Sequence, residues 1–289
     1  MSIKKRKMKK ESLGYLQIII ASILFGFVPI VVRFGGNLGP YNLSFFRVLV
    51  SAASLGIYFF FFKKKFTNFK YEKGKLLFFG AIHGFIILGY FIAIQFLSIA
   101  SAVLLLYSSS VWIILFSYFI LKEKITKLDL VALFIAFVGV VLILSPKNFF
   151  VAESLIGSVS GLLAGIGFGL VYVLSKTFKK YDKVSLTFWQ NLIAIPFLVP
   201  LLFIDFPIFT FKDIWIIIFL SIICTTIPFI LVFKGFQKIP AKKGGIVILL
   251  DIIFPILFSL LIFKEIPQIS TLIGGALIII GAYLTTHNK

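Results

Sequence analysis

The chain contains ten apolar segments that are each long enough to cross a lipid bilayer. They lie approximately at residues 13–32, 42–62, 75–96, 102–121, 128–144, 155–175, 185–204, 214–233, 245–263 and 271–286. Lipid offers no hydrogen-bond partners to the backbone, so continuous apolar segments of this length cross as helices. Barrel strands would instead alternate apolar and polar residues over about ten positions. The sequence therefore predicts an all-α membrane protein with ten transmembrane helices.

Composition agrees with this prediction and limits the alternatives. Hydrophobic residues make up 60% of the 289 residues and charged residues only 13%, whereas soluble domains are about 25% charged. The first apolar segment lacks a small-residue cleavage site, so we expect a permanent helix and not a cleaved signal peptide. The sequence thus predicts a multi-pass protein of the cell membrane, in contact with membrane lipid.

Lysine and arginine are distributed unequally between the two sides of these helices. Of the 29 such residues, 24 lie in the N-terminal tail, in alternate loops and at the C-terminus, and four lie in the other loops. Cytoplasmic loops carry the excess of basic residues, so both termini are predicted to be cytoplasmic. The net charge of +19 follows from these loops and their attraction to anionic lipid headgroups. Binding of nucleic acid is therefore not expected.

One stretch of the sequence occurs almost unchanged a second time. Residues 114–123 read ILFSYFILKE, and residues 256–265 read ILFSLLIFKE. A shift of 142 residues gives seven identities in the 19 positions that begin at Tyr107, where about two are expected by chance. A shift of 143 residues also aligns 13–33 with 156–176. The chain is therefore predicted to be an internal duplication.

The two copies are predicted to have opposite orientations in the membrane. Each contains five helices, an odd number, so the second copy must start from the opposite side. Such inverted repeats can exchange conformations and open a central site to either face. The predicted organisation is a basic cytoplasmic tail at 1–12, a first repeat at 13–145, an external linker at 146–153, a second repeat at 154–286 and a cytoplasmic end at 287–289.

Short motifs at the ends of both halves resemble a known family. They are Glu123-Lys-Ile-Thr with Gly139-Val-Val-Leu in the first half, and Glu265-Ile-Pro with Gly274-Gly and Gly281-Ala-Tyr-Leu in the second. Together with Pro40 and Arg47, they resemble the repeat unit of EamA-type transporters of the drug/metabolite transporter (DMT) superfamily. The resemblance covers residues 13–286 and implies movement of small organic solutes through a central cavity.

Asp251 is the first candidate for a functional residue, because it is the one acidic side chain well inside a predicted helix. Burying a carboxylate there costs about 2.5 to 3.5 kcal/mol, so it needs a partner or a cavity. The repeat alignment places Asp251 opposite Ser109, next to Tyr107 and Ser108. These four residues are predicted to form a substrate or coupling site, and a structural carboxyl between helices is the alternative.

Two basic side chains also lie inside predicted helices. His83 lies near the middle of the 75–96 helix, where imidazole suits proton exchange or recognition of an anionic group, although a packing role is also open. Arg47 lies about two turns into its helix, and we favour its extension to the membrane interface over a role in the cavity. Gln190 replaces Arg47 in the second half. No residue has metal-ligand spacing to His83, so no metal site is predicted.

Aromatic residues and prolines complete the candidates. Trp112, Tyr90, Tyr107 and Tyr172 lie in helices whose family counterparts line the pathway, which the resemblance implies for this chain too. Aromatic walls suit amphipathic or cationic solutes, and ordinary packing is the alternative. Pro228 and Pro255 each remove a backbone hydrogen bond inside an apolar helix. They are therefore candidate hinges.

The sequence and the resemblance together predict a secondary transporter that works by alternating access. Its substrates would be small organic metabolites, such as amino acids or related solutes, which it would export or exchange, with proton coupling as one hypothesis. An uncoupled facilitator or channel is the alternative. An intramembrane enzyme is a remote alternative, because no reacting constellation is visible in the helices. No cofactor is expected, and a homodimer is left open.

Overall fold

The computed structural model describes residues 3–33, 38–62, 67, 72–97, 99–144, 155–204 and 209–287. All regular structure in these parts of the chain is helical. The elements are α1 (Ile3–Arg33), α2 (Pro40–Phe62), α3 (Lys73–Phe96), α4 (Ile99–Tyr107), α5 (Ser109–Leu121), α6 (Lys127–Leu144), α7 (Leu155–Thr177), α8 (Lys183–Leu198), η1 (Val199–Phe203), α9 (Phe211–Ser221), η2 (Ile222–Thr226), α10 (Ile227–Phe236), α11 (Ala241–Val247), η3 (Ile248–Ile252), α12 (Ile253–Phe263) and α13 (Ile269–His287).

These elements form ten membrane-crossing stretches, called spans 1 to 10 in chain order. Nine helical stretches in the described parts of the chain are long and apolar enough to cross a membrane. The tenth is α6, whose 18 residues extend about 27 Å as a helix. The predicted all-α membrane fold with ten transmembrane helices is confirmed. The first helix starts earlier than its apolar segment, at Ile3, because lysine and arginine favour helix formation.

Three spans are interrupted within their length by residues outside regular α-helix, and span 7 ends in the 3-10 turn η1. Span 4 consists of α4 and α5 and is interrupted at Ser108. Span 8 contains the π turn η2 between α9 and α10, and span 9 contains the 3-10 turn η3 between α11 and α12. Turns of these kinds inside α-helices often occur at functional sites or hinges. Spans 4 and 9 are counterparts in the repeat. Span 8 packs at the centre of the bundle.

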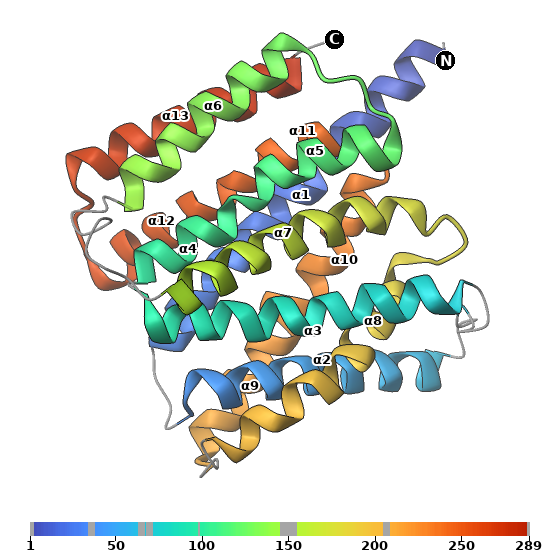
Figure 1. Cartoon of the computed structure of the whole chain (residues 1–289), viewed down its shortest axis with the longest axis vertical. Helices are drawn as coiled ribbons and strands as arrows, with labels where there is room; N and C mark the ends of the chain where they lie inside the picture. The colour runs from blue at the N-terminus through green and yellow to red at the C-terminus, as the bar shows by residue number, and fades with distance from the viewer. Residues whose placement is uncertain are drawn as a thin grey trace.

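The two halves pack in equivalent ways. The helix α1 packs against α10 and α12, and its repeat counterpart α7 packs against α3, α4 and α5. The counterparts α6 and α13 pack against each other at one edge of the bundle (Figure 1). Each counterpart comes five places later in the order of spans, an odd number, so counterparts cross the membrane in opposite directions. The two repeats are therefore inverted, as the duplication predicts.

Glycines set the distance between α7 and span 4. A Cβ atom at Gly165 would lie 2.3 Å from the carbonyl oxygen of Leu105, and one at Gly169 would lie 2.6 Å from Cβ of Trp112. A side chain at either position would push the two backbones apart. Small residues at such contacts allow the close packing on which helix association in membranes depends.

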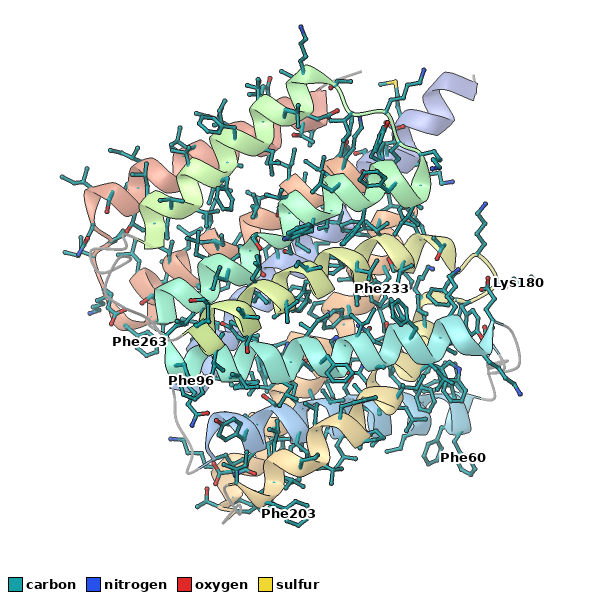
Figure 2. The ribbon with its side chains drawn as sticks, in the orientation of Figure 1. Phe60, Phe96, Lys180, Phe203, Phe233 and Phe263 are labelled. Atoms are coloured by element: carbon teal, nitrogen blue, oxygen red, sulfur yellow. The ribbon has the colours of Figure 1, made fainter. Side chains whose placement is uncertain are left out.

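Large apolar side chains cover the outside of the bundle as well as its interior. Phe60 and Phe203 are 79% and 83% exposed and point away from the helices, whereas Phe233 is fully buried (Figure 2). Exposed apolar area on this scale is unusual for a soluble monomer. Lipid tails solvate such side chains, so the surface agrees with a protein that is surrounded by a bilayer.

Both termini lie at the same end of the bundle (Figure 1). This end, called the basic end, also carries the turn after α5 and the turn before α11, which meet where Glu123 contacts Ala241. The opposite end is called the distal end. The charge distribution predicts that the basic end faces the cytoplasm.

Gly165→Ala is expected to destabilise the protein, because the new methyl group would press on a backbone carbonyl that cannot move alone. Overpacking of this kind costs about 1 to 3 kcal/mol, so the midpoint of thermal unfolding in detergent should fall by several degrees. Gly275→Ala is the control, since nothing lies within 4 Å of a Cβ atom there and alanine favours helix. Equal midpoints for the two variants would contradict the tight packing of α7.

Candidate functional site

The interruptions of spans 4 and 9 lie at equivalent positions of the two repeats. The 142-residue shift aligns Ser108, the interruption of span 4, with Leu250 inside η3. Both spans therefore depart from regular α-helix at the same depth in the bundle. Discontinuous helices near the bilayer midplane expose backbone groups and form ligand sites in many membrane proteins. The centre of spans 4 and 9 is thus the natural place to look for a site.

A hydrogen bond joins the two interruptions. The hydroxyl of Tyr107, the last residue of α4, donates to the carboxylate of Asp251 in η3, at 3.1 Å. Tyr107 is the one hydrogen-bond partner that the described part of the chain gives to Asp251. Both side chains are half-buried. The carboxylate therefore keeps acceptor capacity for a ligand or a proton in the interior of the bundle.

The serines next to Tyr107 have different environments. Ser109, which the repeat aligns with Asp251, is buried within α5, and the contact with Asp251 comes from Tyr107 instead. The hydroxyl of Ser108 donates to the carbonyl of Leu105 in its own span, at 2.5 Å. That bond satisfies a carbonyl at the interruption, so Ser108 stabilises the break in span 4.

A second polar contact links span 2 to the π turn of span 8. Arg47 donates from Nε to the hydroxyl of Thr225, and Ser51 lies 2.7 Å from the hydroxyl of Thr226. The two threonines in turn donate to carbonyls of Leu220 and Ser221 that the wider π turn leaves available. Arg47 is thus held against span 8 within the bundle, whereas the sequence favoured its extension to the interface.

Charge interactions connect these two polar contacts. Arg47 interacts electrostatically with Asp251, and both interact with Tyr90 and Tyr172. Five of the predicted residues therefore share one region in the interior of the bundle: Arg47, Tyr90, Tyr107, Tyr172 and Asp251. This central region contains one acidic group, one basic group and several phenol rings. A polar solute with a charge at each end could bind there, with each end next to the group of opposite charge.

His83 lies beside this region without a hydrogen bond. It is 2% exposed, and its ring packs edge-on against Phe229 with 5.2 Å between centroids. Neither ring nitrogen has a hydrogen-bond partner in the described part of the chain, although a buried polar group normally has one. His83 interacts electrostatically with Arg47. Its nitrogens are therefore free to bind water, a solute or a proton.

Other predicted residues lie in helix contacts. Trp112 packs its Cβ against Gly169 of α7 and its ring against Phe116, so it contributes to the packing of α5 and α7. Tyr172 also stacks on Phe236, with 5.3 Å between centroids. These contacts support the packing alternative for Trp112 and give Tyr172 both a packing contact and a place in the central region.

The candidate hinge prolines each follow a non-α turn. Pro228 is at the start of α10, directly after the π turn, and Pro255 is in the first turn of α12, directly after η3. Because η2 and η3 continue directly into α10 and α12, each proline lacks the backbone N–H that would donate to a carbonyl of the preceding turn. Both prolines therefore lie where their spans depart from regular α-helix, and their role as hinges stays a prediction.

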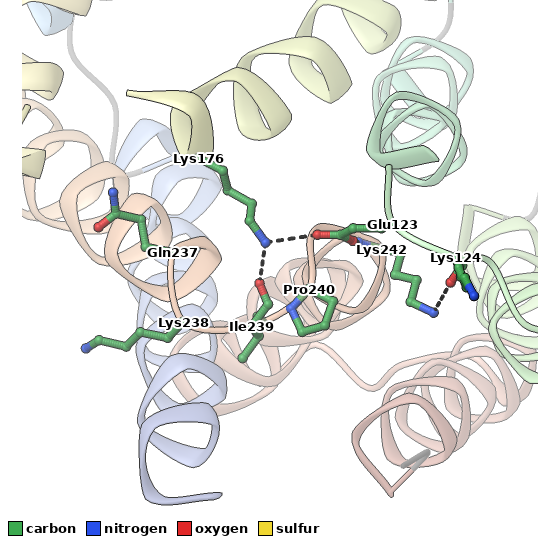
Figure 3. A pocket seen from close by; sticks show the side chains of 8 residues that line it. All are labelled: Glu123, Lys124, Lys176, Gln237, Lys238, Ile239, Pro240 and Lys242. Atoms are coloured by element: carbon green, nitrogen blue, oxygen red, sulfur yellow. Dashed lines mark hydrogen bonds and ion pairs between the residues drawn. The ribbon is translucent and has the colours of Figure 1, made fainter. Parts of the chain in front are cut away.

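Sequence reasoning missed the residues that join the two repeats at the basic end. Glu123 accepts hydrogen bonds from Lys176 and from the start of α11, and Lys242 forms an ion pair with Asp129 at 2.6 Å. Glu123, Lys176 and Lys242 border a cavity of about 400 Å³ at this end (Figure 3). The available signal is the repetition of Lys-Glu at the ends of the echoed segments.

A helical bundle of two inverted repeats, with interrupted spans and an interior carboxylate, is typical of membrane transporters. The EamA-like transporter family matches residues 12–145 and 155–287. The chain therefore belongs to the EamA-like transporter family, as the short motifs predict.

Relatives and a solved structure agree with this assignment. The uncharacterized transporter YoaV of Bacillus subtilis is 23% identical, over 79% of this chain and 81% of YoaV. An uncharacterized transporter of Archaeoglobus fulgidus is 30% identical, over 53% of this chain and 54% of the relative. One from Helicobacter pylori is 28% identical, over 67% of this chain and 65% of the relative. The chain thus spans about half to two thirds of the length of the last two relatives. A crystal structure with 18% sequence identity matches 94% of this chain and 96% of its own chain with a TM-score of 0.84, which shows a shared fold.

Thr225→Val is expected to destabilise the protein, because it removes the acceptor of Arg47 while it keeps the size of the side chain. Arg47 is half-buried, and leaving a charged donor in the interior without its partner costs about 1.5 to 3 kcal/mol, which thermal unfolding in detergent would detect. Thr225→Ser retains the hydroxyl and should remain close to wild type. If both variants unfold at the same temperature, the contact between Arg47 and Thr225 contributes nothing to stability.

Proposed function

We propose that this transporter moves a small organic metabolite by alternating access through the region around Asp251. The observation that carries the proposal is the hydrogen bond from Tyr107 to Asp251. It joins the interrupted turns of two spans that belong to opposite repeats. Movement of one repeat against the other would therefore change the surroundings of the carboxylate directly.

The charges of the central region favour a zwitterionic solute, such as an amino acid. The carboxylate of Asp251 would bind the ammonium group, and the guanidinium of Arg47 would bind the carboxylate in place of Thr225. Tyr90 and Tyr172 would provide aromatic walls for the rest of the solute. The family and its relatives support a transporter in place of an enzyme, and export or exchange of such solutes is the direction that we propose.

Two coupling schemes fit this site. In the first, Asp251 binds either a proton or the ammonium group, so the solute exchanges for a proton. His83, whose nitrogens have no hydrogen-bond partner in the described part of the chain, is the second candidate to carry the proton. In the alternative scheme, the protein is an uncoupled facilitator or channel in which both residues only bind solute. The first scheme is preferred, because an intramembrane carboxylate with one hydrogen-bond partner is costly to keep without a function.

A zwitterionic amino acid is expected to raise the unfolding temperature of the purified transporter. A ligand at about 100 times its Kd stabilises the folded state by about 2.7 kcal/mol. A panel of amino acids, the matching amines and the matching carboxylates would be compared in a thermal-shift assay. Amines and carboxylates should stabilise less than the zwitterion, because each leaves one charged group of the site unpaired. A solute class that stabilises Asp251→Asn as well as the wild type does not use this carboxylate.

Asp251→Asn is expected to abolish the response of transport to a pH gradient. Uptake of the solute found in the thermal-shift panel would be measured in proteoliposomes with and without the gradient. The gradient should stimulate the wild type, and uptake by the variant should fall by about tenfold or more and become insensitive to the gradient. Glu72→Gln, which changes a surface carboxyl paired with Lys75, is the charge-matched control. An Asp251→Asn variant with full pH dependence would exclude Asp251 as the coupling group.

A further inference from the structure

The helices α1 and α10 come from opposite repeats and approach each other closely at the basic end. A Cβ atom at Gly14 would lie 2.9 Å from Cβ of Lys238, and one at Gly235 would lie 2.8 Å from the carbonyl oxygen of Gly14. Small residues allow such an approach, because no side chain separates the two backbones. Residues within a turn of this contact are therefore brought close to the opposite helix, and several of them are lysines.

Three lysines gather where α1 meets α10. Lys10 belongs to α1, Lys234 belongs to α10, and Lys238 follows the end of α10. Burial and the like charges of Lys234 and Lys10 lower the pKa of Lys238 from its usual value. The Nζ atom of Lys238 donates to the neutral amide oxygen of Gln17 in α1, at 2.8 Å. Lys238 is therefore held at the contact between the helices, although a lysine of each helix repels it.

No carboxylate in the described ranges of the chain forms an ion pair with these three lysines. Glu123 lines the cavity at the basic end together with Lys238, but it pairs with Lys176 at 3.0 Å. Figure 3 shows the side chain of Lys238 directed away from both of them. The three lysines thus form a cluster of positive charge that attracts an external anion.

Exposed apolar side chains continue from this cluster toward the middle of the membrane. On α1, Leu13 and Leu16 are exposed and follow Lys10 at intervals of three residues, which places them along one side of the helix. On α10, Ile227 is exposed and lies two turns from Lys234 on the same side. Lipid headgroups flank the hydrocarbon core of a bilayer. A surface that is cationic where the spans end and apolar further in therefore matches the two parts of a phospholipid.

We propose that an anionic phospholipid binds where α1 meets α10, with its phosphate among Lys10, Lys234 and Lys238 and its acyl chains along the apolar side chains of the two helices. Ammonium groups bind phosphate through charge-assisted hydrogen bonds, and each lysine at the membrane surface adds to the attraction of anionic lipid. Because α1 and α10 belong to opposite repeats, the lipid would connect the repeats at the basic end. The site does not include Asp251, so it is independent of the solute proposed above.

Native mass spectrometry of the purified full chain in an uncharged detergent tests this site, because it counts the lipids bound to each protein molecule. The probes are dioleoyl phosphatidylglycerol, which has a net negative charge, and dioleoyl phosphatidylcholine, whose choline group balances the charge of its phosphate. In a separate arm, inorganic phosphate is added at the same concentration as the lipid. Ionic strength is kept constant, because salt screens exposed charges.

A variant that combines Lys10→Gln, Lys234→Gln and Lys238→Gln is expected to bind the first molecule of phosphatidylglycerol about tenfold or more weakly than the wild type. Phosphatidylcholine should bind equally to both proteins. Lys234→Gln alone changes an exposed side chain, with little risk to folding, and should weaken the binding of phosphatidylglycerol by a smaller factor.

The matched control combines Lys73→Gln, Lys127→Gln and Lys179→Gln. It removes the same number of exposed lysines from other loops at the basic end. This control should bind phosphatidylglycerol as tightly as the wild type.

Equal losses of affinity in the two triple variants would overturn the site, because the attraction would then come from the overall charge of the basic end. Wild-type affinity in both Lys234→Gln and the triple variant that contains it would overturn it too. Displacement of phosphatidylglycerol by an equal concentration of inorganic phosphate would exclude a lipid as the occupant.

Discussion

The hydrogen bond between Tyr107 and Asp251 connects the two repeats in the interior of the bundle. Lipid provides no partner for a carboxylate, so the protein must supply one or keep the group neutral. The partner comes from the interrupted turn of span 4, and the carboxylate comes from the equivalent turn of span 9. The arrangement places the most costly side chain of the interior at the point where the two halves can move relative to each other.

Close helix packing surrounds this polar centre and restricts how the halves can move. Gly165 and Gly169 bring α7 of the second repeat against span 4 of the first with no space for a side chain, so any group of helices that moves together would combine helices of both repeats. Turns such as η2 and η3 often occur at hinges, which makes them the candidate points of bending in spans 8 and 9.

The two ends of the bundle differ in the contacts of equivalent side chains. At the basic end Glu123 accepts hydrogen bonds from α7 and α11, and Lys242 pairs with Asp129. At the distal end Glu265 accepts a hydrogen bond from Ser259. The differences concern a few side chains, chiefly Asp129 and Lys242, and leave the backbone of the turns that follow spans 4 and 9 alike.

The sequence predicts the spans well because helix formation in lipid depends on local apolar length. The echoed segments likewise predict the inverted duplication, since they are read directly from the residues. The π turn at Thr225 and the 3-10 turn at Asp251 could not be predicted, because they depend on packing between spans. For the same reason the alignment paired Asp251 with Ser109, whereas the longer side chain of Tyr107 makes the contact. The inward position of Arg47 also follows from Thr225, a residue of a distant span.

Access to position 109 from the two faces tests most directly whether the centre of spans 4 and 9 lies on an alternating pathway. Ser109→Cys in a Cys224→Ala background would be treated in membrane vesicles with a thiol reagent that cannot cross the bilayer, from each side in turn. Labelling from both faces is expected, with the solute changing the two rates in opposite directions. Labelling from one face under all conditions, or from neither face, would contradict an alternating pathway.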